Sequence, residues 1–284
     1  MAKNHSLLDQ INQLIESGSL ELPVFNTIAV SLRELGAEET LDIREMERLI
    51  ASDQAVAADV LRMANSPFYG GLSTISTIQN AIVRLGLRQV RRLILLASQR
   101  AEYRARDRDL SGILLRLWNH ASATALGAQW IAERVQAKAI VDVCFIGGLL
   151  HDIGQLVILR AIDEIKYGAE TKETIPSSLV REVLMAAHSQ VGYNLLRQWN
   201  LPEVYQRIAL NHHIDNFDSA DLPLTIVRLA NEATRKLGVS LEPDNSIVLA
   251  STPEANALKI SDITLAEFEI MLEDYLSEAE PALQ

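Results

Sequence analysis

The chain has almost no cysteine and too little positive charge for several classes of protein. Cys144 is the only cysteine among 284 residues, so an intramolecular disulfide and a zinc site built from cysteines are both excluded. The 26 Lys and Arg residues are outnumbered by 37 Asp and Glu, which gives a formal net charge of −11. Because nucleic-acid affinity comes largely from cations that neutralise phosphates, we do not expect direct nucleic-acid binding.

Long hydrophobic runs are also missing. The longest nearly apolar run, Ala139 to Leu150, spans 12 residues and contains Asp142. A membrane-spanning helix needs about 20 apolar residues. The first residues carry no basic stretch followed by an apolar block, which argues against a secretory signal. We therefore expect no membrane span and a cytoplasmic location.

What the sequence does contain is helical periodicity. Apolar residues make up 48% of the chain, enough to bury a sizeable core. They recur at intervals of three or four residues, and no set of alternating segments suggests a sheet, so the sequence predicts an all-α helical bundle. Helices are expected over about 7–15, 26–35, 43–50, 53–65, 76–86, 87–100, 110–134, 139–150, 177–199, 202–213, 222–237 and 265–275.

Histidines provide the main chemical signal. Five of the six lie between residues 110 and 215, inside or at the ends of expected helices: His120, His151, His188, His212 and His213. A buried imidazole needs a hydrogen-bond partner or a metal. If they converge, their nitrogens and the Asp152 carboxylate form a mixed ligand set for a divalent metal that could activate water against a phosphodiester. Taken singly, each histidine is better explained as a paired core residue; only the set as a whole favours a metal site.

Two motifs carry a resemblance to a known family. The sequence GGLLHDIGQ at 147–155, preceded by LWNHAS at 117–122, resembles the HD superfamily of metal-dependent phosphohydrolases. The order of further motifs is similar to the HDOD domain, an HD-related output domain of bacterial signalling proteins. These motifs are LPV at 22–24, LRMANSPFYG at 61–70, STIQNAIVRLG at 76–86, HSQVG at 188–192 and WNLP at 199–202. The resemblance covers about residues 20–235.

The resemblance implies a metal site that has lost one ligand. By analogy with catalytic HD proteins, His120, His151 and Asp152 would be metal ligands, with His151 and Asp152 the catalytic candidates. The fourth ligand, an Asp in those relatives, most nearly matches Asn231, whose neutral carbonyl should bind a cation less tightly. His188 and the pair His212 and His213 resemble the extra ligands of two-metal relatives. The implied cofactor is Mn, Fe, Ni, Zn or Mg; the alternative is that no metal is bound.

Relatives that cleave cyclic di-GMP follow the HD pair with a lysine and carry a Gly-Tyr-Pro signature. This chain has Gln155 at the first position and lacks the second motif. Both differences argue against phosphodiester cleavage.

Arginine is concentrated in one segment. Eight arginines and two acidic residues lie between Arg84 and Arg108, a local balance of +6 that leaves −17 for the rest of the chain. Four of them recur at helical spacing and predict a positive stripe for an acidic protein partner: Arg84, Arg88, Arg91 and Arg92. The alternative is a solvated surface paired with nearby acids.

Together these features predict a bacterial signalling module that acts by protein interaction, with a degenerate HD metal site. The predicted organisation is an N-terminal helical subdomain at 1–108, an HD-like core at 109–240 and a C-terminal extension at 241–284. The alternative function is a metal-dependent phosphohydrolase acting on a nucleotide or phosphodiester. A third is a sensor that binds a nucleotide without cleaving it.

Overall fold

The computed structural model describes residues 6–17, 20, 46–47, 50–51, 54–66, 69, 73–100, 102–168 and 175–279. These residues form helices joined by turns and loops, and no strand occurs among them. The predicted all-α fold is confirmed. The LPV motif, the expected helix at 26–35 and most of the one at 43–50 lie outside the described residues.

Most of the described helices begin and end within a few residues of the expected positions. Their bounds are α1 Leu7–Glu16, α4 Gln54–Asn65, α5 Ile78–Leu85, α6 Leu87–Arg100, α7 Arg108–Arg134, α8 Val141–Leu150, α9 Ile153–Gly168, α10 Ser177–Gln198, α11 Glu203–Asn211, α12 Leu222–Lys236, α13 Pro253–Leu258 and α14 Asp262–Ala279, with short 3₁₀ turns at Lys138–Ile140 and Leu249–Ser251.

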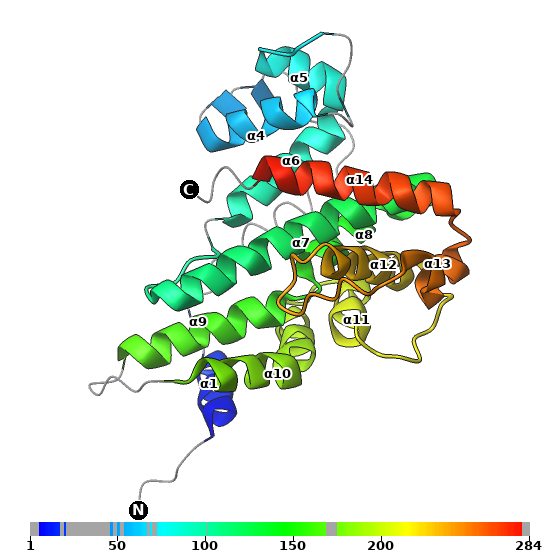
Figure 1. Ribbon diagram of the computed structural model, residues 1–284. Coiled ribbons are helices and arrows are strands. Elements are labelled where there is room, and N and C mark those ends of the chain that lie inside the picture. The colour runs from blue at the N-terminus through cyan, green and yellow to red at the C-terminus, as the bar shows by residue number, and fades with distance from the viewer. Residues whose placement is uncertain are drawn as a thin grey trace, which may run out of the picture. The chain divides into compact units, whose positions relative to one another are not determined.

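The long helix α7 forms the centre of the larger packed unit (Figure 1). Asp107 caps its start by accepting hydrogen bonds from the backbone N–H groups of Asp109 and Leu110. Every residue from His120 to Ala132 is buried, and many are alanine, which allows neighbouring helices to approach closely. Helices α8, α9 and α12 pack on α7, while α11 packs on α8, α10 and α12. Several helices therefore surround the middle of α7, where His120 lies.

Helix α9 is absent from the helices expected from the sequence. It begins at Ile153, separated from α8 only by the turn at His151 and Asp152. Residues 153–159 are all buried, so the segment has no polar face to reveal a helical period. A usable signal was the lack of glycine and proline between Gln155 and Tyr167.

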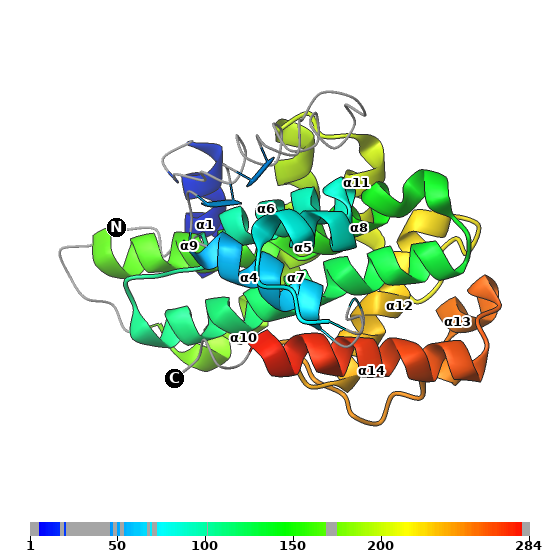
Figure 2. The same cartoon turned by 90° about the horizontal axis from the view of Figure 1, so that it is seen from above.

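Packing divides the chain differently from the predicted ranges 1–108, 109–240 and 241–284. One unit contains residues 1–22 and 103–268, and the other contains 23–102 and 269–284. Helix α1 belongs to the first unit because it packs on α9 and fully buries Ile11. Near the other end of the chain, the Phe268 ring stacks on Trp130 with 5.4 Å between ring centroids. Helix α13 lies beside α12 (Figure 2).

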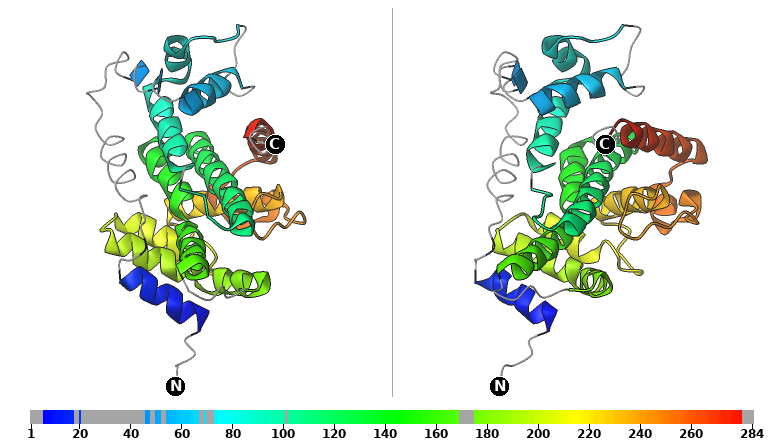
Figure 3. Two further views of the ribbon diagram at one scale, coloured as in Figure 1. Left: turned by 90° about the vertical axis from the view of Figure 1, so that its left-hand side faces the viewer. Right: turned by 60° about the vertical axis from the view of Figure 1, so that its left-hand side comes forward.

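In the second unit, α4, α5 and α6 contact one another (Figure 3). Gly86, with a φ of +80°, separates α5 from α6, so the four arginines do not share one helix. Arg84 donates hydrogen bonds to the carbonyl oxygens of Ala64 and Ser73. Arg92 is buried and donates to Gln89 Oε1 at 3.1 Å, whereas Arg88 is exposed. The expectation of one exposed stripe was wrong for Arg84 and Arg92, because backbone carbonyls at the end of α4 and in the following loop engage the first and burial hides the second.

One described segment, Lys138–Tyr167, is long and apolar enough by length and composition to cross a membrane, with a mean hydropathy of 1.5 in its most apolar window. The turn at His151 and Asp152 divides this segment into α8 and α9. Because 83% of that window is buried inside the fold, we interpret the segment as core helices.

Gly154 permits the contact between the start of α9 and the middle of α10. A Cβ atom at this position would lie 2.0 Å from the carbonyl oxygen of His188 and 2.7 Å from the backbone nitrogen of Gly192. Both atoms are backbone, so neither can move aside like a flexible side chain. The glycine two residues after Asp152 therefore allows α10 to bring His188 close to that carboxylate.

We expect Gly154→Ala to lower the free energy of unfolding by about 2 kcal/mol or more, because overpacking of this kind typically costs about 1–3 kcal/mol. Gly112→Ala is the matched control: a Cβ there meets no atom within 4 Å in exposed helix, so stability should rise by up to about 1 kcal/mol. Urea unfolding measures both. Equal effects of the two substitutions would contradict the close approach at Gly154.

Candidate metal centre

Four helical segments bring the six predicted ligands together. His120 comes from the middle of α7, and His151 and Asp152 form the turn between α8 and α9. His188 comes from the middle of α10, while His212 and His213 follow the last turn of α11. The candidate ligand atoms form two overlapping groups, each with its atoms within 4.8 Å of one another. The groups are His120, His151 and Asp152, and Asp152, His188, His212 and His213.

The Asp152 carboxylate lies between the two groups and faces each with a different oxygen. Oδ2 is 3.3 Å from His120 Nε2 and 3.5 Å from His151 Nε2. Oδ1 is 3.4 Å from His188 Nε2 and 3.2 Å from His212 Nε2. Asp152 is the only residue shared by the two groups. This arrangement is suited to a carboxylate that bridges two neighbouring cation positions.

Backbone carbonyls orient three of the imidazoles. The Nδ1 atom of His151 lies 2.7 Å from the carbonyl oxygen of Gly148, and that of His188 lies 2.8 Å from that of Leu184. His212 Nδ1 lies 2.9 Å from the carbonyl oxygen of Ala209. A carbonyl can only accept, so Nδ1 carries the proton and Nε2 presents a lone pair toward Asp152. Metal-binding histidines are usually oriented in this way.

The lone pairs of these imidazoles approach one another closely. His188 Nε2 and His212 Nε2 are 3.3 Å apart, although both rings use Nδ1 as the donor to a carbonyl. Two unprotonated nitrogens at this distance repel unless a cation or a proton lies between them. His120 Nε2 and His151 Nε2 are 3.1 Å apart, and because no carbonyl holds Nδ1 of His120, its Nε2 can carry the proton that lies between this pair. The donor set of imidazole nitrogen and carboxylate oxygen fits a first-row divalent metal.

Burial favours the protonation states that a metal requires. Burial lowers the pKa of His151 to about 3, and it also lowers the pKa of His188. Burial alone would raise the pKa of Asp152, but the surrounding imidazoles, His151 first among them, hold it well below its ordinary value. His151 and His188 are therefore neutral beside one carboxylate anion.

Asn231 is buried on α12, which packs on α7 and α8, the helices that carry or precede the first ligand group. Its amide nitrogen has no hydrogen-bond partner among the described residues, and neither does Nδ1 of His120. Buried polar atoms without partners are uncommon in folded proteins and can mark a missing ion or water. This is consistent with the position inferred for Asn231, beside the ligand set.

One charged pair near the centre has no counterpart in the sequence predictions. Arg228 on α12 donates from Nη1 to the carbonyl oxygens of His212 at 2.8 Å and Asn211 at 3.2 Å. Its Nε donates to Glu254 Oε1 at 2.7 Å. The sequence did offer one signal for a buried, paired arginine: Arg228 lies within the apolar sequence IVRLA of an expected core helix.

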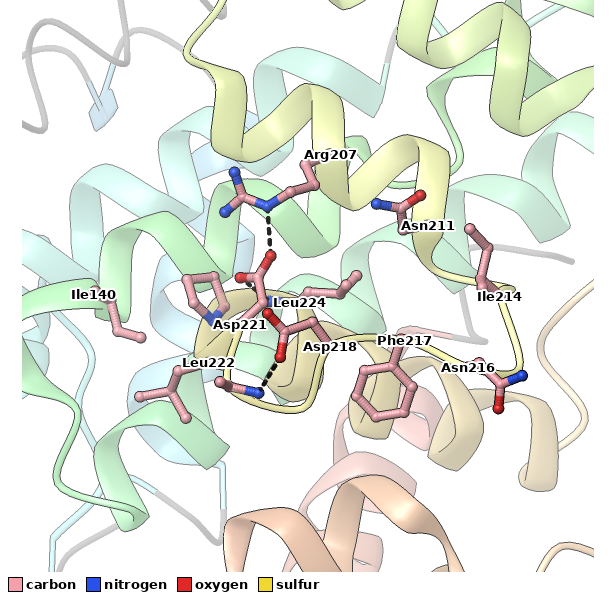
Figure 4. A pocket seen from close by; sticks show the side chains of 12 residues that line it. Ile140, Arg207, Asn211, Ile214, Asn216, Phe217, Asp218, Asp221, Leu222 and Leu224 are labelled. Carbon is pink, nitrogen blue, oxygen red and sulfur yellow. Dashed lines mark hydrogen bonds and ion pairs between the residues drawn. The ribbon is translucent and has the colours of Figure 1, made fainter.

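A pocket of about 580 Å³ lies over the loop between α11 and α12 (Figure 4). Asn211 and Ile214, on either side of the His212 and His213 pair, contribute to its lining, as does the ring of Phe217. None of the six candidate ligands lines this pocket. It is therefore distinct from the cluster around Asp152.

The sequence model of the HDOD domain family matches residues 22–214, which is more than half of the chain. The chain belongs to the HDOD domain family. A protein of Treponema pallidum without a characterised function is 27% identical over 203 residues, covering 69% of this chain. The chain spans only 39% of the length of that relative.

Solved structures share the fold of this HDOD domain. An HDOD domain protein of unknown function from Geobacter sulfurreducens has a TM-score of 0.66 at 21% identity, covering 97% of this chain and 99% of its own. A protein from Shewanella amazonensis described as a candidate metal-dependent phosphohydrolase has a TM-score of 0.65 at 18% identity, covering 97% and 100%. At these identities, the likeness establishes the fold alone.

The histidine pKa values give the metal-free HDOD domain a defined pH dependence. His151 has a pKa of about 3 in the folded chain against an ordinary value of 6.5. Between these values the unfolded chain binds a proton that the folded chain does not, so stability falls as the pH falls. We expect the free energy of unfolding to fall by up to about 1.4 kcal/mol per pH unit for this histidine between about pH 6 and pH 4.

Chemical unfolding of the chelator-treated protein across this range measures the slope. His151→Asn is the comparison, because it removes the titrating group and should give a shallower slope. The same slope in both proteins would show that His151 is not held neutral in the fold.

Proposed function

We propose that this chain is a metal-binding HDOD regulatory domain that acts through protein contacts rather than by turnover. The observation that carries the proposal is the convergence of imidazole Nε2 atoms from four helical segments on the two oxygens of Asp152. Carbonyl hydrogen bonds orient three of these rings before any cation arrives. An arrangement built only for packing has no need to gather so many lone pairs.

The burial of the ligands supports a structural or regulatory role for the metal. His120, His151, Asp152, His188 and His212 are each at most 5% exposed. A catalytic metal keeps an open position that substrate can reach. Asn231 supplies no negative charge to offset a divalent cation, and Gln155 stands where relatives that cleave cyclic di-GMP have a lysine. Both residues favour binding without efficient hydrolysis.

The alternative function is a metal-dependent phosphohydrolase, and one observation favours it. His213 is exposed and lies beside the buried ligands, with its ring centroid 4.1 Å from that of His212 and 5.1 Å from that of His188. The second ligand group therefore has one edge that faces solvent. A divalent cation bound there would supply a Lewis acid for phosphate ester hydrolysis. The Shewanella amazonensis protein with this fold is described as a candidate for such an activity.

Elemental analysis of protein purified without chelator tests the main proposal. We expect bound divalent metal, and we expect chelation to lower the midpoint of urea unfolding. Restoring Mn²⁺ at about 100 times its Kd should return about 2.7 kcal/mol of stability. His151→Ala should abolish both effects. A metal-free protein whose stability is indifferent to Mn²⁺ would disprove metal binding.

The same preparations separate regulation from catalysis. With Mn²⁺ added, we expect no release of product from a panel of phosphodiesters and nucleotides. Turnover that is present in the native sequence and lost in His151→Ala would establish the phosphohydrolase instead.

Asn231→Asp tests the position of the missing ligand. We expect the affinity for Mn²⁺ to rise about tenfold, about 1.4 kcal/mol, because a carboxylate compensates the charge of the cation. Without metal the variant should be less stable than the native protein, since Asn231 is 2% exposed and the new carboxylate would be buried. Titration calorimetry measures the affinity, and Asn231→Ala is the uncharged control. Unchanged affinity in Asn231→Asp would place residue 231 outside the ligand set.

The partner in this proposal is a protein of a signalling pathway, as the family resemblance implies. Of the four arginines predicted to bind it, Arg88 remains exposed on α6 and Arg91 is half-buried. An acidic partner surface would therefore meet Arg88 first. Arg84 and Arg92 would act indirectly, by holding the loop before α5 and the start of α6.

A further inference from the structure

The C-terminal end of α11 is fixed by a side chain from another helix. His212 ends α11, and its own N–H still bonds the carbonyl oxygen of Ile208 at 3.1 Å. The last carbonyls of a helix have no partner within the helix. Arg228 of α12 donates to two of them, those of Asn211 and His212, of which Asn211 also accepts from the backbone N–H of Ile214. Its positive charge also suits the negative end of the helix dipole.

Arg228 is itself held on two further sides. Its Nε donates to Glu254 Oε1 at 2.7 Å, and its guanidinium carbon lies 4.1 Å from the centroid of the Phe217 ring. The side chains of Arg228 and Glu254 are 9% and 2% exposed, so each charge depends on the other. The rigid fork of a guanidinium can contact a carboxylate and two carbonyls at once, which a lysine ammonium cannot do in the same geometry.

Glu254 comes from a part of the chain beyond the family match. The match ends at residue 214, whereas Glu254 lies in the first turn of α13, which packs on α12. Thr252 caps α13 by accepting a hydrogen bond from the N–H of Ala255, and Pro253 occupies its first turn. These local signals place the Glu254 carboxylate where it meets Arg228.

A second arginine pair joins α11 to α12, and it includes none of the six candidate ligands. Arg207 of α11 pairs with Asp221, the residue that caps α12, and this pair lines the pocket in Figure 4. The Arg207 side chain is 40% exposed, against 9% for Arg228. Of these two arginines, Arg228 is the one that donates a hydrogen bond to the backbone of a candidate metal ligand, His212. Substitutions in the two pairs can therefore distinguish general attachment of α11 to α12 from positioning of His212.

We propose that Arg228 and Glu254 are positioning residues that hold His212, with its Nε2 atom directed at Asp152, for metal binding. The inference rests on the proposed metal-binding function. Arg228 fixes the carbonyl of His212 while the carbonyl of Ala209 fixes its Nδ1, so backbone and ring are both constrained. Loss of the first constraint lets the end of α11 unwind and moves Nε2 away from its 3.2 Å approach to Asp152.

The decisive variants are Arg228→Lys and Glu254→Gln, with Arg207→Lys as the matched control. Titration with Mn²⁺ should show an affinity 10–100-fold lower in the first two variants, the range typical for lost partners of metal ligands. The control should match the native protein. With Co²⁺ as the probe, the visible absorption spectrum should change in the first two variants only.

A double variant, Arg228→Met with Glu254→Leu, separates positioning from stability. Apolar residues in place of a buried ion pair often preserve or raise stability. We expect the urea midpoint of the double variant to exceed those of the single variants, while its Mn²⁺ affinity stays reduced. Native affinity in Arg228→Lys or in the double variant would overturn the proposal, whatever happens to stability.

Metal-free protein provides a readout that does not depend on the proposed function. Nitrogen-15 spectra of the imidazoles should show His212 protonated at Nδ1 in the native chain and in Arg207→Lys, and a mixture of tautomers in Arg228→Lys. An unchanged tautomer in Arg228→Lys would overturn positioning even if metal binds. A native chain that binds neither Mn²⁺ nor Co²⁺ would overturn the metal role, and the tautomers would then show whether Arg228 still orients His212.

Discussion

The buried carboxylate of Asp152 is the constraint on which the arrangement of the larger unit depends. An anion inside a helical core is costly unless cations or hydrogen-bond donors surround it. Its neighbours here are four imidazoles, and three of them use their Nδ1–H groups to donate hydrogen bonds to backbone carbonyls. These imidazoles hold the pKa of Asp152 well below its ordinary value, so the carboxylate stays ionised and could offset part of the charge of a divalent cation.

The chain around this carboxylate is shaped to bring ligands in from distant segments. Gly154 lets the start of α9 touch the backbone of α10 at His188, and Gly148 lets α8 approach α7, where a Cβ would meet backbone atoms of Thr124 and Ala125 at 2.8 Å. Arg228 performs a related task for α11 with a charge instead of a missing side chain. Close approach and a buried ion pair thus determine which donors can reach Asp152.

The sequence was sufficient for features that leave a local or periodic signal. Helix α7 and helix α10 follow apolar residues at helical spacing, and the histidine set follows motifs that resemble a known family. Helix α9 was missed because its first half is buried on all sides, which removes the helical period there. Arg92 was misjudged because spacing shows which residues share a face but not whether that face is covered. The pairing of Arg228 with Glu254 spans 26 residues and three elements, so no local pattern could predict it.

The proposed metal centre is buried, which suits regulation through stability better than it suits chemistry. Its ligands come from α7, from the turn between α8 and α9, from α10 and from the end of α11, so a bound cation would join most of the helices of the unit. Separated helices cannot form the site, so the free energy of metal binding would add to the stability of the packed helices. A change in occupancy would alter the helix ends at His151 and His212 before it altered any surface. In the proposed role as a domain that signals by contact, such a change would alter how firmly the helices present their outer faces to a partner.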